Sequence, residues 1–142
     1  MKKYNIKKLH KQIGFTLLEI LIVLAIIGGI MGMVAVQVMG KNEQANVELA
    51  YTQIGNLQGA VTNFRQHTKR LPNSLQELVT QPSGVKKWVG PYVNESELVD
   101  PWGVEFQYRK PGQHGRYDIM SFGADGKSGG TGVDADIGNW QF

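Results

Sequence analysis

The sequence predicts an α+β protein in which a long N-terminal helix, with a membrane half and an amphipathic half, packs on a small antiparallel β-sheet. Three observations predict this class. No charged residue occurs from Ile20 to Gly40. Apolar residues then recur at helical spacing from Val47 to Phe64, and alternation of period two is confined to the last third of the chain. We expect three parts: a basic leader (1–14), an apolar helix (15–40) and a folded domain (41–142).

The leader accounts for the positive sign of the net charge of the chain. It holds five lysines and no acidic residue: Lys2, Lys3, Lys7, Lys8 and Lys11. The formal net charge of +3 includes these lysines, and the remaining chain has 10 basic against 12 acidic residues, which is a net charge of −2. A nucleic-acid-binding domain needs a basic face, so we expect no nucleic-acid partner.

The apolar segment is long enough to cross a membrane, since about 20 apolar residues span a bilayer as a helix. The preceding lysines favour a cytoplasmic leader and place the domain on the other side. An ordinary signal peptide is cleaved after a shorter apolar core. Here the only processing signature precedes that core, at Lys11-Gln12-Ile13-Gly14-Phe15. Cleavage at this point would remove the lysines and keep the helix.

Glu19 is an acidic residue at the start of this apolar segment. A carboxylate at the centre of a span costs about 2.5–3.5 kcal/mol. Two interpretations remain open. The side chain reaches the nearby membrane surface, or it pairs with the new amino group of Phe15 in an adjacent subunit and sets the register of packed helices, because a lone charge is poorly tolerated in an apolar core.

The run Gly14-Phe15-Thr16-Leu17-Leu18-Glu19-Ile20 resembles the class III leader and N-terminus of type IV pilins and pseudopilins. The resemblance implies that a prepilin peptidase cleaves after Gly14 and methylates the amino group of Phe15. It also implies that Glu19 acts in subunit recruitment and assembly.

Many members of this group have a proline late in the apolar helix, where this sequence has Val36. Gly28, Gly29 and Gly32 could weaken the helix instead, since glycine costs about 1 kcal/mol relative to alanine. They could equally allow close packing of helices. Both interpretations stay open.

The second half of the helix carries one apolar stripe, which we expect to pack against a sheet. Its members are Val47, Ala50, Ile54, Leu57, Val61 and Phe64. We expect the helix to run from Phe15 to about Arg65 and to stop at Lys69-Arg70-Leu71-Pro72.

The remaining domain is expected to hold short elements. Ser74 and Glu77 match a capping box and predict a short helix over 75–80. A packed loop should follow over 81–100. Within it Lys86-Lys87-Trp88 is either a partner contact or a solvated stretch with one buried aromatic. Two strands, 104–108 and 117–122, are expected to form a hairpin, and a last short strand includes Ile137 to Trp140.

Acidic and hydroxyl side chains gather in a glycine-rich segment: Asp125, Ser128, Asp134 and Asp136. Such oxygen donors suit Ca²⁺, although positions 127 and 129 lack the carboxylates of an EF-hand. The other interpretation is a solvated acidic turn. The chain has no cysteine, so an exported domain would need packing or a metal, and not a disulfide, for stability.

Further motifs resemble the major pseudopilin of bacterial type II secretion systems: Asp100-Pro101-Trp102-Gly103, Pro111-Gly112-Gln113-His114-Gly115, Ser121-Phe122-Gly123-Ala124-Asp125-Gly126 and Asp134-Ala135-Asp136-Ile137-Gly138-Asn139-Trp140. The resemblance implies the pseudopilin fold and one structural Ca²⁺ in a loop of about 122–138. Its implied ligands are the side chains of Asp125, Asp134 and Asp136 and carbonyls near Phe122 and Lys127, with Ser128 as a further candidate.

The same resemblance implies a function. The chain would be the major structural subunit of a pseudopilus, polymerising from the inner membrane to push folded exoproteins through an outer-membrane channel. Its implied partners are copies of itself, minor pseudopilins, the prepilin peptidase and the inner-membrane assembly platform. The helix would lie in the lipid bilayer before assembly, with the domain in the periplasm.

We expect no catalysis. Beyond the leader only His67 and His114 remain, neither has a local partner of the kind found in a catalytic triad, and no zinc set, P-loop or dinucleotide fingerprint occurs. The alternative functions are a type IV pilus subunit, a minor pilin-like subunit, or a tethered ligand-binding domain.

Overall fold

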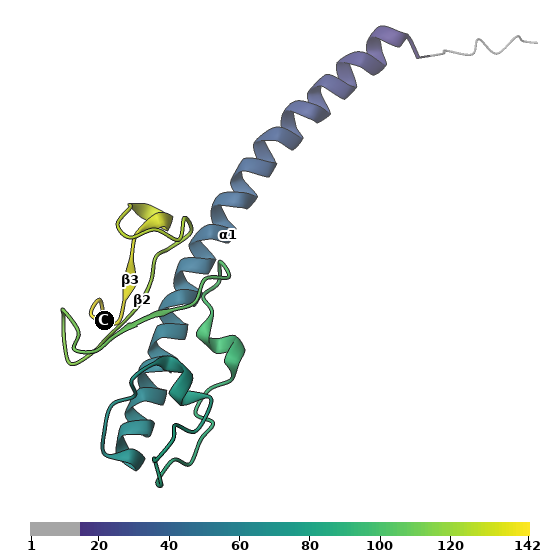
Figure 1. The fold of residues 1–142 in the computed structure, drawn as a ribbon. Coiled ribbons are helices and arrows are strands. Elements are labelled where there is room, and N and C mark those ends of the chain that lie inside the picture. Colours follow the sequence, from purple (N-terminus) through teal and green to yellow (C-terminus); the bar gives the residue numbers. More distant parts are fainter. Residues whose placement is uncertain (1–14) are drawn as a thin grey trace, which may run out of the picture. The chain divides into compact units, whose positions relative to one another are not determined.

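The computed structural model describes residues 15–142, and the side chains of 15–35 and 42–142. The chain divides into two compact units, one ending at Val38 and one comprising Met39–Phe142. Helix α1, Leu17–Thr68, belongs to both (Figure 1). The predicted cleavage after Gly14 lies outside the described residues.

The first unit is the apolar part of α1. Thr16 precedes the helix, and its Oγ1 accepts a hydrogen bond from the Glu19 N–H at 3.2 Å. A threonine at this place satisfies one of the amide groups that the first helical turn leaves free. Every side chain from Phe15 to Ala35 is exposed, and Leu17–Ala35 is long and apolar enough to cross a membrane.

The core of the second unit forms around the predicted stripe. Ala50, Ile54, Leu57, Val61 and Phe64 are at most 1% exposed, and Val47 packs against them half-buried. Residues from the rest of the unit cover this stripe: Leu75, Leu78, Val93, Leu98, Phe106, Ile119 and Ile137. The prediction of an amphipathic second half is therefore confirmed.

Helix α1 ends three residues later than expected, at Thr68. Lys69 follows with a left-handed φ of 62°, and its N–H donates to the Arg65 carbonyl at 2.9 Å. The hydroxyl of Thr68 donates to the Phe64 carbonyl at 2.8 Å. The helix thus closes through a left-handed residue that is not glycine.

The predicted capping box at Ser74 is wrong. The element there is a 3₁₀ helix, η1, Leu75–Leu78, and the Ser74 side chain makes no capping hydrogen bond. The Glu77 carboxylate accepts instead from the backbone N–H of Asn73, at 3.1 Å, and from the Arg70 guanidinium, at 2.8 Å. These donors occupy the carboxylate that a capping box would have used.

The segment 81–100 contains a second 3₁₀ helix, η2, Glu95–Leu98, which was expected to be loop. The Glu97 carboxylate accepts from the Asn94 N–H at 2.7 Å, so the carboxylate cap predicted for η1 occurs here. Lys86 and Lys87 are exposed, while the half-buried Trp88 donates from Nε1 to the Glu77 carbonyl at 2.9 Å. This agrees with a solvated stretch anchored by one aromatic residue.

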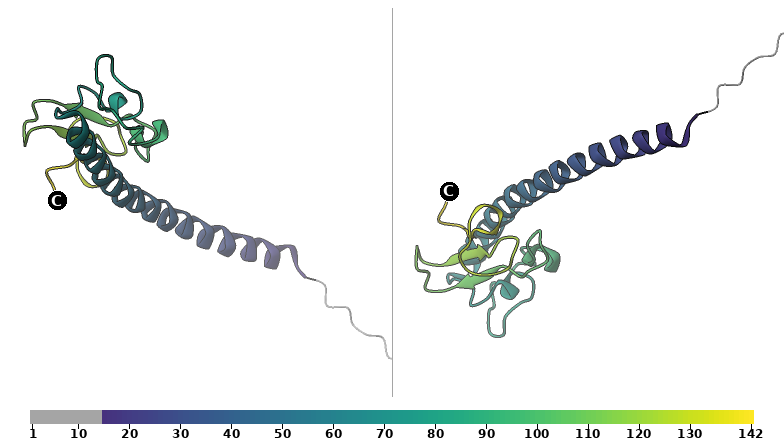
Figure 2. Two further views of the ribbon diagram at one scale, coloured as in Figure 1. Left: turned by 90° about the horizontal axis from the view of Figure 1, so that it is seen from below. Right: turned by 90° about the horizontal axis from the view of Figure 1, so that it is seen from above.

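The sheet is antiparallel with the order β1-β2-β3: β1 is Gln107–Arg109, β2 is Asp118–Ser121 and β3 is Ile137–Gly138. The hairpin pairs Tyr108 with Ile119, and β2 pairs Ser121 with Ile137. The expected hairpin is confirmed, but β1 is shorter, because Val99 and Glu105 form only an isolated bridge. A third 3₁₀ helix, η3, Gly132–Asp134, precedes β3. Figure 2 shows these segments gathered around the second half of α1.

Candidate functional site

The apolar helix presents its side chains outward on every side. Leu17 is 79% exposed, and none of the candidate span Leu17–Ala35 is buried. Glu19 lies in the first turn of α1, where the positive end of the helix dipole favours a carboxylate. The spacing of Thr16 and Glu19 also matches a capping box, a local role that the sequence interpretation of Glu19 missed.

Neither ion pair of the described residues involves Glu19. Pairing of its carboxylate with the amino group of Phe15 in an adjacent subunit stays a prediction. Nothing lies within 4 Å of a Cβ built at Gly28, Gly29 or Gly32. Either role of these glycines, flexibility or close helix packing, stays a prediction.

The acidic loop between β2 and β3 is shaped by glycine at two positions that admit no side chain. A Cβ at Gly123 would lie 2.8 Å from the Val133 carbonyl oxygen, and one at Gly130 would overlap the Asp134 carbonyl oxygen. Both have a positive φ, 69° and 83°, which glycine adopts without strain. The backbone therefore folds back closely on itself.

The loop carboxylates accept hydrogen bonds from the loop itself. Asp136 accepts from the Ser128 hydroxyl at 3.3 Å and from the Gly129 N–H at 3.0 Å. Asp125 accepts from the Lys127 N–H at 3.0 Å. Asp134 is the last residue of η3. The structure thus brings Ser128 to Asp136, while the hydrogen bond of the Asp125 carboxylate is with Lys127. Within residues 15–142 no three His, Cys, Asp or Glu side chains lie close enough together to hold one metal ion.

The donor chemistry of this loop nevertheless fits a hard cation. The candidate side-chain donors are carboxylate and hydroxyl oxygens, which Ca²⁺ prefers, together with main-chain carbonyls. Gly123 ties the loop to the core through its N–H, which donates to the Ser121 hydroxyl at 3.2 Å. Ala124 donates to the Val133 carbonyl at 3.0 Å. Phe122 therefore precedes an anchored part of the loop, and the carbonyls near Phe122 and Lys127 stay predicted ligands.

Two buried carboxylates were not among the predicted site residues. Asp100 is 5% exposed, and its Oδ1 accepts from the N–H groups of Trp102, at 3.1 Å, and Val104, at 2.9 Å. Asp118 is 1% exposed and accepts from the Gln113 N–H at 2.7 Å. An aspartate beside a Pro-containing turn is a signal for such a role. Both carboxylates organise turns and are closed to solvent.

His114 and His67 each contact a polar side-chain atom and an aromatic ring. The His114 Nδ1 lies 3.3 Å from Asp118 Oδ2, and its ring stacks on Trp140 with centroids 3.9 Å apart. The His67 Nδ1 lies 3.0 Å from the Tyr92 hydroxyl. These contacts pack histidine against aromatic side chains, which is a structural arrangement.

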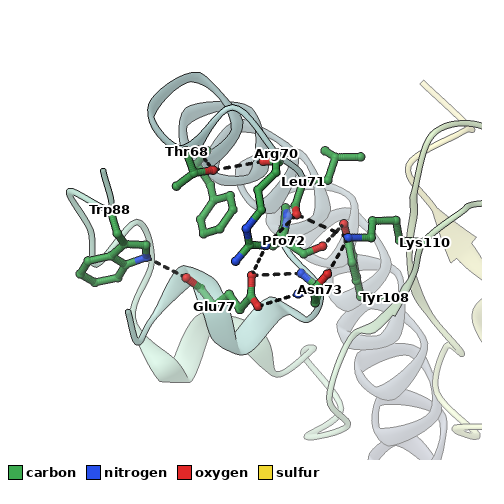
Figure 3. Close-up of polar contacts among 10 residues, drawn as sticks. Thr68, Arg70, Leu71, Pro72, Asn73, Glu77, Trp88, Tyr108 and Lys110 are labelled. Carbon is green, nitrogen blue, oxygen red and sulfur yellow. Dashed lines mark hydrogen bonds and ion pairs between the residues drawn. The ribbon is translucent and has the colours of Figure 1, made fainter. Parts of the chain in front are cut away.

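A polar network joins the end of α1 to η1 and β1 (Figure 3). Glu77 binds Arg70 and Asn73, and Lys110 Nζ donates to Asn73 Oδ1 at 2.7 Å. Burial alone would raise the pKa of Glu77, but the hydrogen bonds and charge of Arg70, with the Asn73 donors, hold it below 4.5. The Tyr108 hydroxyl completes the network by donating to the Pro72 carbonyl at 3.0 Å.

Family comparisons cover both units of the chain. Residues 37–140 match the family model described as type II secretion system (T2SS), protein G. Residues 9–35 match the prokaryotic N-terminal methylation motif. The second match includes Gly14, Phe15 and Glu19, the residues singled out above.

Individual relatives agree with these matches. The type II secretion system core protein G of Xanthomonas campestris is 44% identical over 126 residues, which cover 89% of this chain and 88% of that protein. The protein of the same name from Vibrio cholerae is 38% identical over 142 residues, with 96% and 97% coverage.

A solved structure is also similar. It is the crystal structure of the major pseudopilin from the type 2 secretion system of enterohaemorrhagic Escherichia coli, with a TM-score of 0.59 and 29% identity. The match covers 73% of this chain and 94% of that one. From its methylation motif to its last strand, the chain belongs to the type II secretion system protein G family.

Proposed function

We propose that this chain is the major structural subunit of a type II secretion pseudopilus. The observation that carries this proposal is the apolar half of α1, whose described side chains are all exposed. Such a surface is stable in lipid or against other apolar helices, and it is costly in water. Copies that leave the membrane would therefore bury this half of α1 against one another. The family match over 37–140 supports this function over that of a type IV pilus subunit.

In this proposal the subunit is processed before it assembles. The prepilin peptidase cleaves after Gly14 and methylates the amino group of Phe15, which the match to the methylation motif supports. Mass spectrometry of the mature protein should find an N-terminal methylated phenylalanine. A product that begins after about residue 35, without the apolar segment, would overturn the proposal.

Before assembly the subunit would cross the inner membrane once, with its domain in the periplasm. The candidate span Leu17–Ala35 and the basic leader support this orientation. Protease added to spheroplasts should digest the domain, and protease added to intact cells should not. Protection in spheroplasts would contradict the orientation. The minor pseudopilins and the inner-membrane assembly platform would be its partners there.

Glu19 is proposed to direct assembly by pairing with the Phe15 amino group of an adjacent copy. Its carboxylate lies in the first turn of α1 and makes no described ion pair. We expect Glu19→Ala to leave membrane insertion intact and to reduce filament yield and secretion strongly. Glu48→Ala is a matched control, because Glu48 is an exposed carboxylate on the same helix. Normal filament yield in the Glu19 variant would contradict this role.

The acidic loop is proposed to hold one Ca²⁺ as a structural ion. Asp136 and Asp125 would supply carboxylate oxygens and Ser128 its hydroxyl, with Asp134 and the carbonyls of Phe122 and Lys127 as further ligands. The bound ion supplies a positive charge that neutralises the loop carboxylates. A ligand that binds only the folded state stabilises it by about 2.7 kcal/mol at 100 times its Kd.

Thermal unfolding of the full chain in detergent tests the calcium site. Calcium should raise the Tm relative to a chelator, and Asp136→Ala should abolish this difference. Glu105→Ala removes an exposed carboxylate outside the loop, and this variant should keep the difference in Tm between calcium and chelator. Identical melting curves with calcium and with chelator would refute the site, while leaving the assembly proposal to its own tests.

A further inference from the structure

Trp102 and Glu43 join the turn after η2 to the beginning of the folded unit. The indole Nε1 of Trp102 donates to Glu43 Oε2 at 2.8 Å, across 59 positions of sequence. Both residues are half-buried. Among the described side chains of α1, Glu43 is the first along the helix that hydrogen-bonds to another element. This contact therefore fixes the helix close to the boundary between the two units.

The turn that carries Trp102 is held rigidly by a buried carboxylate. Asp100 Oδ1 accepts from the N–H groups of Trp102 and Val104, and the Asp100 N–H donates to the Val104 carbonyl at 2.7 Å. A charged acceptor with two backbone donors makes comparatively strong hydrogen bonds. The indole ring is thus held in place by its own backbone.

The second oxygen of the same carboxylate leads to the acidic loop. Asp100 Oδ2 accepts from the Ser121 hydroxyl at 2.5 Å, and this hydroxyl oxygen accepts from the Gly123 N–H at 3.2 Å. Asp100 is 5% exposed and Ser121 is 1% exposed, so water does not compete for these bonds. A continuous chain of buried hydrogen bonds therefore links Gly123, near the start of the acidic loop, to the turn of Trp102.

We propose that Glu43 and Trp102 form a clasp through which the acidic loop positions the start of the domain's part of α1. The inference rests on the proposed calcium loop. An ordered loop holds Ser121 against Asp100, Asp100 holds the turn, and the Trp102 indole holds Glu43. Loss of the ion loosens the loop and with it the helix at residue 43. Trp102 and Glu43 are thus positioning residues for the helix that assembles.

Hydrogen exchange measured by mass spectrometry tests this on the full processed chain in detergent micelles, with calcium and with a chelator. In the unaltered protein, chelation should accelerate amide exchange both in the loop (122–136) and at 42–50. Trp102→Phe keeps an aromatic ring and removes the N–H donor. In this variant exchange at 42–50 should be about tenfold faster even with calcium, and chelation should then accelerate only the loop.

Matched variants separate the clasp from general destabilisation. Trp88→Phe removes an indole donor that binds the Glu77 carbonyl, and it should behave like the unaltered protein at 42–50. Glu43→Gln keeps a hydrogen-bond acceptor, so its amide exchange at 42–50 should match that of the unaltered protein. Glu43→Ala removes the acceptor and should show the faster exchange expected for Trp102→Phe. Glu43 is only half-buried, so its variants should fold even if Trp102→Phe does not.

Two results would overturn the inference, and they can be told apart. If chelation accelerates amide exchange at 42–50 in Trp102→Phe and in Glu43→Ala as it does in the unaltered protein, the clasp proposal is wrong while the calcium site stands. If chelation changes neither segment in any variant, the calcium proposal and the inference fail together.

Discussion

Replacing Glu77 tests the polar network at the end of α1 most directly. Its carboxylate accepts from Arg70 Nη1 at 2.8 Å, from the Asn73 N–H at 3.1 Å and from Asn73 Nδ2 at 3.1 Å. In Glu77→Gln one oxygen remains as an acceptor, and the new amide group faces donors. We expect this variant to lower the free energy of unfolding at pH 7.

The magnitude follows from the geometry. Hydrogen bonds to a charged group contribute about 1.5–3 kcal/mol. The Arg70 side chain is 34% exposed, and exposed pairs contribute only about 0–1 kcal/mol. We therefore expect a loss of about 2 kcal/mol. For a domain of about 100 residues this lowers the Tm by roughly 10 °C.

The loss of unfolding free energy in Glu77→Gln should be larger at neutral pH than at low pH. The folded protein holds the pKa of Glu77 below its ordinary value of 4.5, because the Arg70 and Asn73 donors outweigh the effect of burial. The stabilisation is therefore complete above pH 4.5 and disappears as the pH falls through the folded pKa. The difference between the two proteins should shrink below pH 4.5.

The assay is urea unfolding of the full chain in detergent, at pH 7 and at pH 3, followed by tryptophan signals. All three tryptophans, Trp88, Trp102 and Trp140, lie in the folded unit. Glu97→Gln is the control, because the hydrogen bonds of this carboxylate within the described residues are with Asn94 and include no cation. Equal stability of Glu77→Gln and the unaltered protein at pH 7, or a deficit that stays the same at pH 3, would refute the reasoning.

Three further changes probe the core, the helix end and the sheet. Phe64→Ala removes a fully buried ring and should cost about 3–5 kcal/mol in urea unfolding; a cost below 1 kcal/mol would contradict its place in the core. Lys69→Gly relieves a left-handed φ of 62° and should add about 1 kcal/mol, seen as a higher Tm. Burial, with the nearby charges of Tyr117 and Glu77, raises the pKa of Tyr108 to about 12. Ultraviolet titration should therefore show a tyrosine that ionises near pH 12 and that is missing in Tyr108→Phe.

The helix and its core could be predicted because local periodicity determines them. The residues of the stripe lie three or four apart, and the same face of one helix buries them. The hairpin was equally accessible, since alternation and a Pro-Gly turn are local signals. The element at 95–98 was missed because its cap lies in Asn94 and Glu97, a weaker signal than the serine and glutamate at 74 and 77 that proved misleading.

The candidate sites were also only partly predictable from the sequence. The residues of the acidic loop were predicted from composition, but composition gives no geometry: it could not show that Asp125 accepts from the Lys127 N–H and Asp136 from the Gly129 N–H. The link from Glu43 to Trp102 spans 59 positions. No pattern of short period can predict such a pair, because it forms only when the whole unit folds.

The buried stripe on α1 also determines how the domain bears mechanical load. It extends from Ala50 to Phe64, about 21 Å along the axis. Tension applied along the helix shears all of these contacts at once, whereas a sideways pull peels them apart one turn at a time. A subunit drawn lengthwise by its helix would therefore keep its domain folded under forces that would unzip it in the other direction.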